Sequence, residues 1–143
     1  MIETAEVRKR LLQAIDHVRR TAAAHRADAD LASSRFDEFA RTTAAPVFRQ
    51  AAQALRAEGF AFQVFTPAGS VRLASERSGE DFIELALDTA RQPVALVGRI
   101  SHTRGRHVVE NERVVFEGPD LERMTDEHVL EFLLEALPPF VER

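Results

Sequence analysis

Apolar side chains recur at helical spacing along residues 3–40, where steps of four and three residues alternate without a break. The positions in this series are Leu11, Ile15, Val18, Ala22, His25, Ala29, Ala32, Phe36 and Phe39. Such a series is a heptad seam, the pattern through which helices pack against other helices. We predict a helix over residues 3–40 with this seam as its buried face.

The middle of the seam is weak, because alanine buries little area and one position is a histidine. Two aspartates and two serines within residues 28–34 can also interrupt the helix, since their side chains compete for backbone hydrogen bonds. The pattern leaves open whether the helix is continuous or restarts at Arg35 behind a Ser34 cap. It also leaves open whether the seam contacts a second copy or folds back onto the chain's own sheet or next helix.

A second, shorter helix is predicted around Pro46, which marks a restart or a kink because proline has no N–H to donate. Its apolar side chains, at amphipathic spacing, are Phe48, Ala51, Ala52 and Leu55. Gly59 stands where a left-handed C-terminal cap is expected. The first 59 residues are therefore predicted to be helical.

A last helix is predicted over residues 126–137, with Thr125 as its N-cap and acidic residues in its first turn. Its apolar stripe is wide, which predicts contact with more than one surface. The proline pair at residues 138–139 should stop the helix and leave Phe140 and Val141 as a hydrophobic tail.

Between the helices, strand-type runs alternate with turn residues. The predicted strands are residues 60–65, 71–76, 82–88, 94–101 and 108–116. The last of them either runs on or breaks in its middle, at residues 110–112. The fourth, mostly apolar and β-branched, is expected to be a central strand buried on both faces.

The register of the second and third strands follows from their apolar pattern. A three-residue loop at residues 78–80 pairs Leu73 with Leu85 and keeps Arg72 and Glu84 together on the other face. A two-residue turn would mix both faces. We therefore predict the first register.

Together these elements predict the α+β class: N-terminal helices, an antiparallel meander sheet of five or six strands, and a C-terminal amphipathic helix. The helices should cover one face of the sheet. We expect a single domain over residues 1–143, with a helical segment at 1–59, the sheet at 60–117 and the last helix within 125–141.

Composition narrows the function classes. The chain has 143 residues, 45% hydrophobic and 29% charged, as globular proteins do. Its net charge of −4 argues against nucleic-acid binding, and it has no cysteine for a thiol site. No apolar run is long enough to span a membrane, and the first twenty residues carry charges throughout. A cytoplasmic location without membrane association is the expectation.

The hairpin predicted at residues 99–107 concentrates polar side chains that could bind a ligand. Its candidate anion-binding residues are Arg99, His102, Arg104 and Arg106, since guanidinium groups match phosphate and carboxylate. The alternative is a solvated tip. If Arg104 and Gly105 form that tip, Glu110 on the next strand neutralises Arg99, and His102 faces His107. Two facing histidines are too few for a metal site, so neither a metal nor another cofactor is predicted.

No catalytic motif is present, so no catalytic residue is predicted and an enzyme is not favoured. We interpret the chain as a non-enzymatic interaction protein, a homodimeric adaptor or chaperone-like binder that could also take a protein partner. The candidate interface residues are Leu11, Ile15, Val18, Ala22, Phe36 and Phe39. The alternative is a small-ligand or anion-binding domain with an arginine-lined pocket near the 99–107 hairpin.

Overall fold

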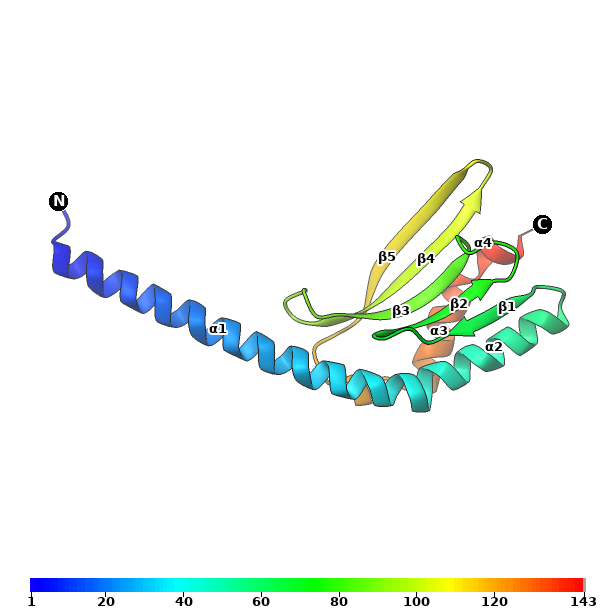
Figure 1. Cartoon of the computed structure of the whole chain (residues 1–143), viewed down its shortest axis with the longest axis horizontal. Coiled ribbons are helices and arrows are strands. Elements are labelled where there is room, and N and C mark those ends of the chain that lie inside the picture. The colour runs from blue at the N-terminus through cyan, green and yellow to red at the C-terminus, as the bar shows by residue number, and fades with distance from the viewer. Residues whose placement is uncertain (143) are drawn as a thin grey trace.

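The computed structural model describes residues 1–142; Arg143, the last residue of the expected single domain, lies outside the described residues. N-terminal helices, an open antiparallel sheet and a C-terminal helix confirm the predicted α+β class (Figure 1). Five strands follow one another in the order β1-β2-β3-β4-β5, which is a meander. Within residues 1–142, none of the helices combines the length and the apolar character that a membrane span requires.

The helical elements are α1 (Thr4–Phe39), the π-helical η1 (Ala40–Ala44), α2 (Ala45–Ala57), the 3-10 turn η2 (Leu121–Arg123), α3 (Asp126–Ala136) and α4 (Pro138–Val141). The strands are β1 (Phe62–Phe65), β2 (Ser70–Ser75), β3 (Phe82–Asp88), β4 (Ala95–Arg104) and β5 (His107–Glu117). The third strand has its predicted bounds, and the others differ from prediction by a few residues. β5 runs on as one strand, so the break considered in its middle does not occur.

α1 is one continuous helix of 36 residues, and the interruption considered at residues 28–34 does not occur. Its last turns are held by three buried side chains, Ala32, Phe36 and Phe39. Beside them, Arg35 Nη1 lies 2.5 Å from Asp120 Oδ1 and 3.3 Å from Glu122 Oε1. This packing outweighs the weak helix preference of the neighbouring aspartates and serines.

The helix continues past Phe39 through a π-helical segment instead of stopping. Pro46, in the first turn of α2, has no N–H to donate, and the hydrogen-bond ladder changes register just before it. There the Ala45 N–H donates to the carbonyl of Ala40, five residues earlier. In Figure 1 the chain bends at this junction, which is the form that the predicted restart or kink takes. α2 ends at Ala57, and Gly59, which follows its C-cap Glu58, has a φ of +91° that confirms the predicted left-handed cap.

The core lies between the sheet and the helices on one of its faces. Gly98 of β4 identifies that face, because a Cβ added there would lie 2.2 Å from Cε1 of Phe132 on α3. The large buried side chains of this core include Phe48, Leu73, Ile83, Leu85, Leu96, Leu121 and Val129. α2 and α3 both lie on this side of the sheet (Figure 1). As predicted, β4 is buried on both faces over its first half.

The predicted register of β2 and β3 is wrong by two residues: Leu73 lies opposite Ile83, not opposite Leu85. The loop between the two strands is also longer than the three residues predicted. A shift of two residues keeps every side chain on its predicted face, so the apolar pattern could not distinguish the two registers. The observed register places Arg72 directly opposite Glu84.

The pairing register of the β4–β5 hairpin is also shifted by two residues, because moving the tip by one residue changes both strands. Its two-residue tip is Gly105-Arg106, one residue later than predicted, and Arg99 therefore lies opposite Glu112 and not Glu110. Gly105 has a φ of +64°, which suits the first central position of the tight turn that joins twisted strands.

The C-terminal helix begins as predicted. The Thr125 hydroxyl accepts the His128 N–H at 3.3 Å, and His128 Nδ1 accepts the Thr125 N–H at 3.1 Å. α3 ends before the proline pair, and the residues predicted as a hydrophobic tail belong to the short helix α4, which begins at Pro138. There Phe140 packs edge-on against Phe62, with ring centroids 6.0 Å apart.

Candidate functional site

The N-terminal part of α1 projects away from the remainder of the molecule (Figure 1). We call residues 4–21 the arm and residues 22–142 the body. Every residue from Val7 to Thr21 is exposed, whereas Ala22 and His25 are partly covered and Ala32 is buried. At a rise of about 1.5 Å per residue, the arm extends about 27 Å from the body.

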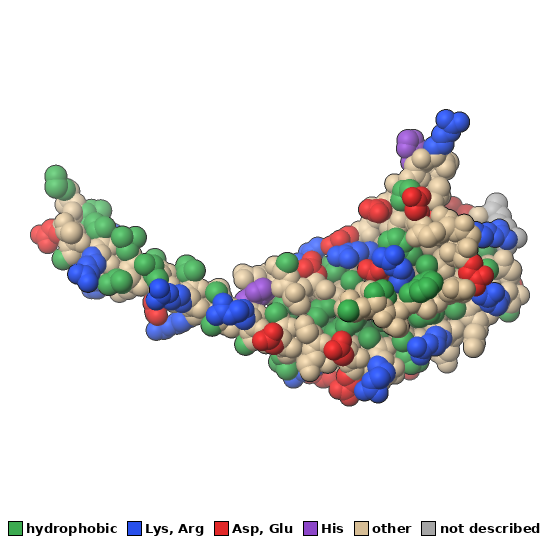
Figure 2. All heavy atoms as spheres, in the orientation of Figure 1, with side chains coloured by type: hydrophobic (Ala, Val, Ile, Leu, Met, Phe, Trp, Pro, Cys, Tyr) green, Lys and Arg blue, Asp and Glu red, His purple; other side chains and the backbone are tan. Residues whose placement is uncertain are grey.

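The arm exposes five large apolar side chains, which we call the arm stripe: Val7, Leu11, Leu12, Ile15 and Val18. Their exposed fractions range from 41% for Val7 to 64% for Val18. Helical spacing places four of them on one face, with Leu12 at its margin. Figure 2 shows apolar atoms gathered along one side of the arm. A contiguous apolar surface of this kind usually marks an interaction site.

The arm stripe continues the helix face that packs on the body. Where α1 meets the body, His25 Nε2 donates to the carbonyl of Arg91, which precedes β4, at 3.0 Å. Further along, the seam residues Phe36 and Phe39 are buried in the chain's own core. The C-terminal half of the seam therefore folds onto the body, whereas its N-terminal half stays exposed. Each of the two arrangements that the sequence left open can apply to one half of the seam.

The six predicted interface residues consequently fall into two groups. Phe36 and Phe39 are 2% and 4% exposed within the chain and belong to its core. Leu11, Ile15 and Val18 stand on the arm, and Ala22 is partly covered where the arm joins the body. The surface offered to a partner is thus narrower than the full seam. The exposed surface of the arm also includes Val7 and Leu12, which the heptad pattern did not contain.

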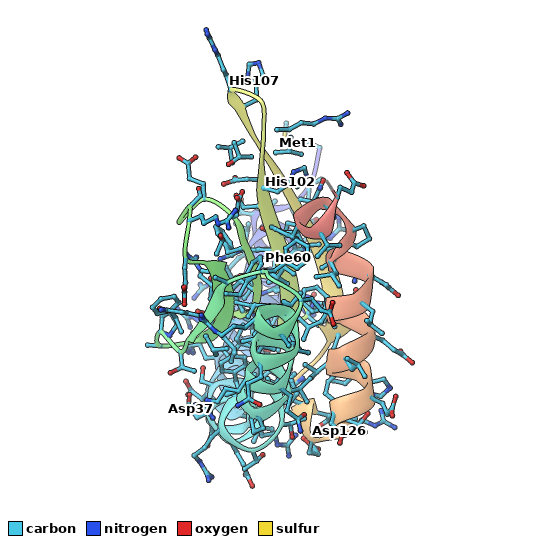
Figure 3. The ribbon with its side chains drawn as sticks, turned by 90° about the vertical axis from the view of Figure 1, so that its right-hand side faces the viewer. Met1, Asp37, Phe60, His102, His107 and Asp126 are labelled. Atoms are coloured by element: carbon cyan, nitrogen blue, oxygen red, sulfur yellow. The ribbon has the colours of Figure 1, made fainter. Side chains whose placement is uncertain are left out.

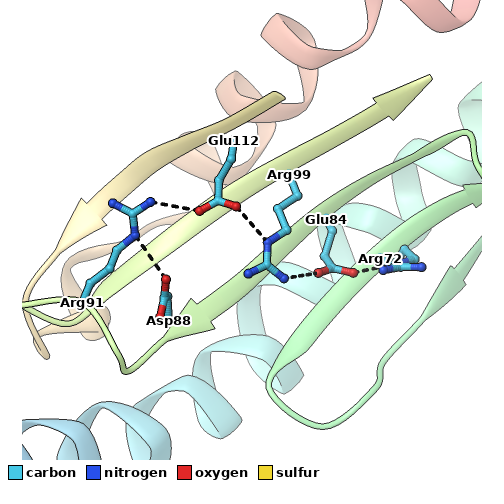
Figure 4. A network of polar contacts seen from close by, with 6 residues as sticks. All are labelled: Arg72, Glu84, Asp88, Arg91, Arg99 and Glu112. Carbon is cyan, nitrogen blue, oxygen red and sulfur yellow. Dashed lines mark hydrogen bonds and ion pairs between the residues drawn. The ribbon is translucent and has the colours of Figure 1, made fainter. Parts of the chain in front are cut away.

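The sheet face opposite α2 and α3 carries a row of alternating charges across four strands, which we call the charge ladder (Figure 4). Glu84, with only 4% of its side chain exposed, accepts from Arg72 Nε at 2.6 Å and lies 3.5 Å from Arg99 Nη1. Arg99 Nε also donates to Glu112 at 3.3 Å, and Arg91 donates to the same carboxylate at 2.9 Å. The ladder joins β2 to β5 and to the loop before β4.

These contacts shift the titration of the groups that form them. The hydrogen bond from Arg91 holds the pKa of Glu112 below its usual value, and Arg99 adds to that effect. In return, Glu112 raises the pKa of Arg91. At the other edge of the sheet, a hydrogen bond from Arg56 lowers the pKa of Glu76. The ladder residues satisfy one another, which is the behaviour of a structural network.

The predicted anion-binding residues do not converge. Arg99 points to the charge ladder, whereas His102 lies on the opposite face of β4, with its ring 6.1 Å from that of Phe140. His102 lies opposite Val109 and not, as predicted, opposite His107. Figure 3 shows His107 at the far end of the hairpin, away from His102.

The arginines of the hairpin tip, Arg104 and Arg106, are exposed. A hollow of about 290 Å³ lies instead beside His102, where Arg77, Asp81 and Phe140 are among its lining residues. Sequence reasoning missed Arg77, because it stands in a loop with no motif around it. The hollow brings one predicted residue, His102, together with an arginine from another part of the chain.

A second surface lies on α3, whose wide apolar stripe is only partly covered. Val129 and Leu133 face the core, while Leu130 and Leu134 are 41% and 57% exposed. Beside this helix, a groove of about 490 Å³ runs along the edge strand β5. An ion pair between Arg113 and Glu135, which are 2.6 Å apart, joins β5 to α3. The body therefore offers both an exposed strand edge and exposed apolar residues next to it.

Among residues 1–142, no group of three or more histidine and acidic side chains is placed to hold a metal ion. Comparisons with protein-family models, with curated proteins and with solved structures find no match for this chain. The arm stripe, with five exposed large apolar side chains on one helix, is the surface best suited to bind a partner.

Proposed function

We propose that the chain is a non-enzymatic interaction protein, an adaptor or chaperone-like binder, that forms a homodimer through its arm. The arm stripe carries this proposal. Tertiary packing supplies most of the stability of a helix in a protein, and residues 7–21 of the arm are exposed throughout. Large apolar side chains gain about 1.5–3 kcal/mol each when they are fully buried. A partner that covers the stripe therefore stabilises the helix and buries its apolar face together.

A second copy is the partner that the stripe fits. Three of its residues, Leu11, Ile15 and Val18, keep the alternating spacing of a heptad seam, and two identical seams can pack against each other. Closed two-fold assemblies are also the commonest arrangement of soluble oligomers. Pairing through the arms leaves each body free. The β5 edge and the neighbouring Leu130 and Leu134 then remain accessible to a protein partner, which supports the adaptor role.

Sedimentation equilibrium and native mass spectrometry of the full chain, at tens of micromolar, test this proposal. We expect the mass of two chains, with dissociation on dilution. A mass of one chain across the accessible concentration range would contradict the homodimer. Native spectra would at the same time reveal any small molecule that stays bound.

The hollow beside His102 supports a second candidate function, the binding of a small anion. Arg77 and His102 both line it, and Asp81, which accepts the Thr103 N–H at 2.7 Å, lies at its wall. If this candidate is right, inorganic phosphate should raise the Tm of the chain.

Two double variants locate such a site. The Arg77→Gln/His102→Gln variant should lose the rise in Tm if phosphate binds in the hollow. The Arg104→Gln/Arg106→Gln variant should lose it if phosphate binds at the hairpin tip. No rise in the unmutated chain would remove anion binding as a function of this region.

A further inference from the structure

We propose that the two arms pair antiparallel, with residue 13 of each chain beside the two-fold axis, so that the bodies lie at opposite ends of a short helical rod. This inference rests on the proposed function, because it specifies how a second copy occupies the arm stripe. It follows from the place where the body meets the seam, from the spacing of the stripe, and from the charges along the arm.

The body limits how far a second helix can extend along α1. From His25 onward the seam is already in use, since His25 contacts Arg91 and the later positions Ala32, Phe36 and Phe39 are buried. A second arm can therefore cover the seam only as far as about Ala22, which is partly exposed. The overlap of two arms is confined to residues 4–22.

Within this overlap, one antiparallel register covers the whole stripe. It sets Leu11 level with Ile15 of the second copy, and Val7 within one residue of the level of that copy's Val18. Leu12 then stands beside the axis and meets Leu12 of the second copy. Leu11 and Ile15 then lie at the centre of the contact on each arm, with Val7, Val18 and Leu12 toward its edges.

The neighbouring registers, one heptad away, fail for structural reasons. A shift toward the bodies drives the N-terminal turns of each arm onto the part of the seam that contains His25 and Ala29, where the body is docked. A shift in the other direction leaves Val18 beyond the end of the second helix, because α1 begins only at Thr4. The body thus acts as a stop that selects the register.

Charge along the arm favours antiparallel over parallel pairing. Three consecutive bases stand at residues 8–10, and Glu6 precedes them. Parallel arms place these bases beside their own copies, which is repulsive. Antiparallel arms separate these bases from their own copies and place them level with residues 16–18 of the second copy. The opposed helix dipoles also attract in this orientation.

The arrangement separates the two bodies. Ala22 of one chain and Ala22 of the other lie about 27 Å apart along the rod, at about 1.5 Å per residue. Each β5 edge is then presented at its own end of the dimer. The assembly is a bivalent spacer, which is a property that parallel arms, with both bodies at the same end, would not have.

Spin-label distance measurements by pulsed electron resonance test the orientation directly. The chain has no cysteine, so a single introduced cysteine carries a unique label. Suitable sites are Gln13→Cys, Arg20→Cys and Ala27→Cys, which are exposed and lie opposite the stripe. Antiparallel arms predict the shortest interchain distance at residue 13. The axial separation grows by about 21 Å at each of the next two sites.

The outcomes separate the inference from the proposed function. A two-chain mass with equal distances at the three sites overturns the antiparallel arrangement but leaves the homodimer standing. A minimum at residue 20 or 27 overturns the register. A one-chain mass without any interchain distance overturns both proposals. Dilution of each labelled chain with excess unlabelled chain should remove the signal, which confirms that it arises between chains.

Discussion

Glu84 on β3 accepts a hydrogen bond from Arg72 on β2 at 2.6 Å, although only 4% of the glutamate side chain is exposed. Arg99 on β4 approaches its other carboxylate oxygen at 3.5 Å. The carboxylate is therefore held between two cations whose own side chains are 36% and 45% exposed. This residue ties three strands of the sheet together on the face that α2 and α3 do not cover.

We expect Glu84→Gln to lower the free energy of unfolding by about 1–3 kcal/mol, because an amide cannot replace the charge that both arginines contact. The loss should stay below the cost of breaking a fully buried pair, since Arg72 and Arg99 can still reach water. Urea unfolding measures the change. The control is Glu110→Gln on the exposed part of β5, which should change stability by less than about 0.5 kcal/mol. Equal losses in the two variants would contradict a special role for Glu84.

Gly98 makes possible the closest approach between the sheet and α3. A Cβ at this position would lie 2.2 Å from Cε1 and 2.7 Å from Cζ of Phe132. We expect Gly98→Ala to destabilise the fold by about 1–3 kcal/mol through overpacking. The matched control is Gly79→Ala, which meets no atom within 4 Å and should be neutral or slightly stabilising.

A double-variant cycle identifies the cause of that loss. In the Gly98→Ala background, Phe132→Leu should cost less than it does alone, because the smaller side chain relieves the clash. Additive losses, measured by the same urea unfolding, would show that the ring of Phe132 is not what excludes a side chain at residue 98.

The elements of this fold were predictable because strong local signals specify them. Thr125 caps α3, Gly59 with its positive φ follows the C-cap of α2, and alternating residues define the strands. Strand register was not predictable from the apolar pattern. Both hairpins are shifted by two residues, and such a shift leaves every side chain on its face. The direct pairing of Arg72 with Glu84 is the kind of cross-strand contact that distinguishes the two registers.

The division of the seam was not predictable either. Ile15 and Leu11 occupy the same heptad positions as Phe36 and Phe39, yet the first pair is exposed and the second is buried. Their difference arises from the body, which meets α1 only from Ala22 onward. The hollow beside His102 was not predictable for a similar reason: its lining residues come from loops and strands that are far apart in the chain.

The charge ladder should make the free energy of unfolding depend on pH in the acidic range. The pKa of Glu112 is lowered from about 4.5, mainly by the hydrogen bond from Arg91. A lowered pKa in the folded state contributes stability above the unfolded value of about 4.5, and this contribution is lost as pH falls through the folded value. We expect Arg91→Gln to raise the pKa of Glu112 toward 4.5, measured by NMR titration of its carboxyl carbon. The Arg77→Gln control should leave that titration unchanged.

The arm provides the last prediction, which concerns the Leu11→Glu/Val18→Glu double variant. Two charges placed in the stripe should prevent two arms from packing, because the apolar contacts of Leu11 and Val18 are lost and two carboxylates would have to be desolvated. We expect the mass of one chain by sedimentation. The helical circular-dichroism signal should also fall, since the arm then has no packing partner to stabilise it. The thermal transition of the body should remain, because Phe36 and Phe39 anchor α1 within the chain.

The matched control is Gln13→Glu/Ala24→Glu, which adds the same charge on the exposed face of α1 opposite the stripe. This variant should keep the two-chain mass and the helical signal of the unmutated protein. If both double variants dissociate alike, added negative charge and not loss of the stripe is the cause. If neither does, the arms do not hold the dimer, and the exposed Leu130 and Leu134 of α3 become the surface to test. A stable monomer for the unmutated chain would contradict the homodimer, and anion binding beside His102 would then be the function to test.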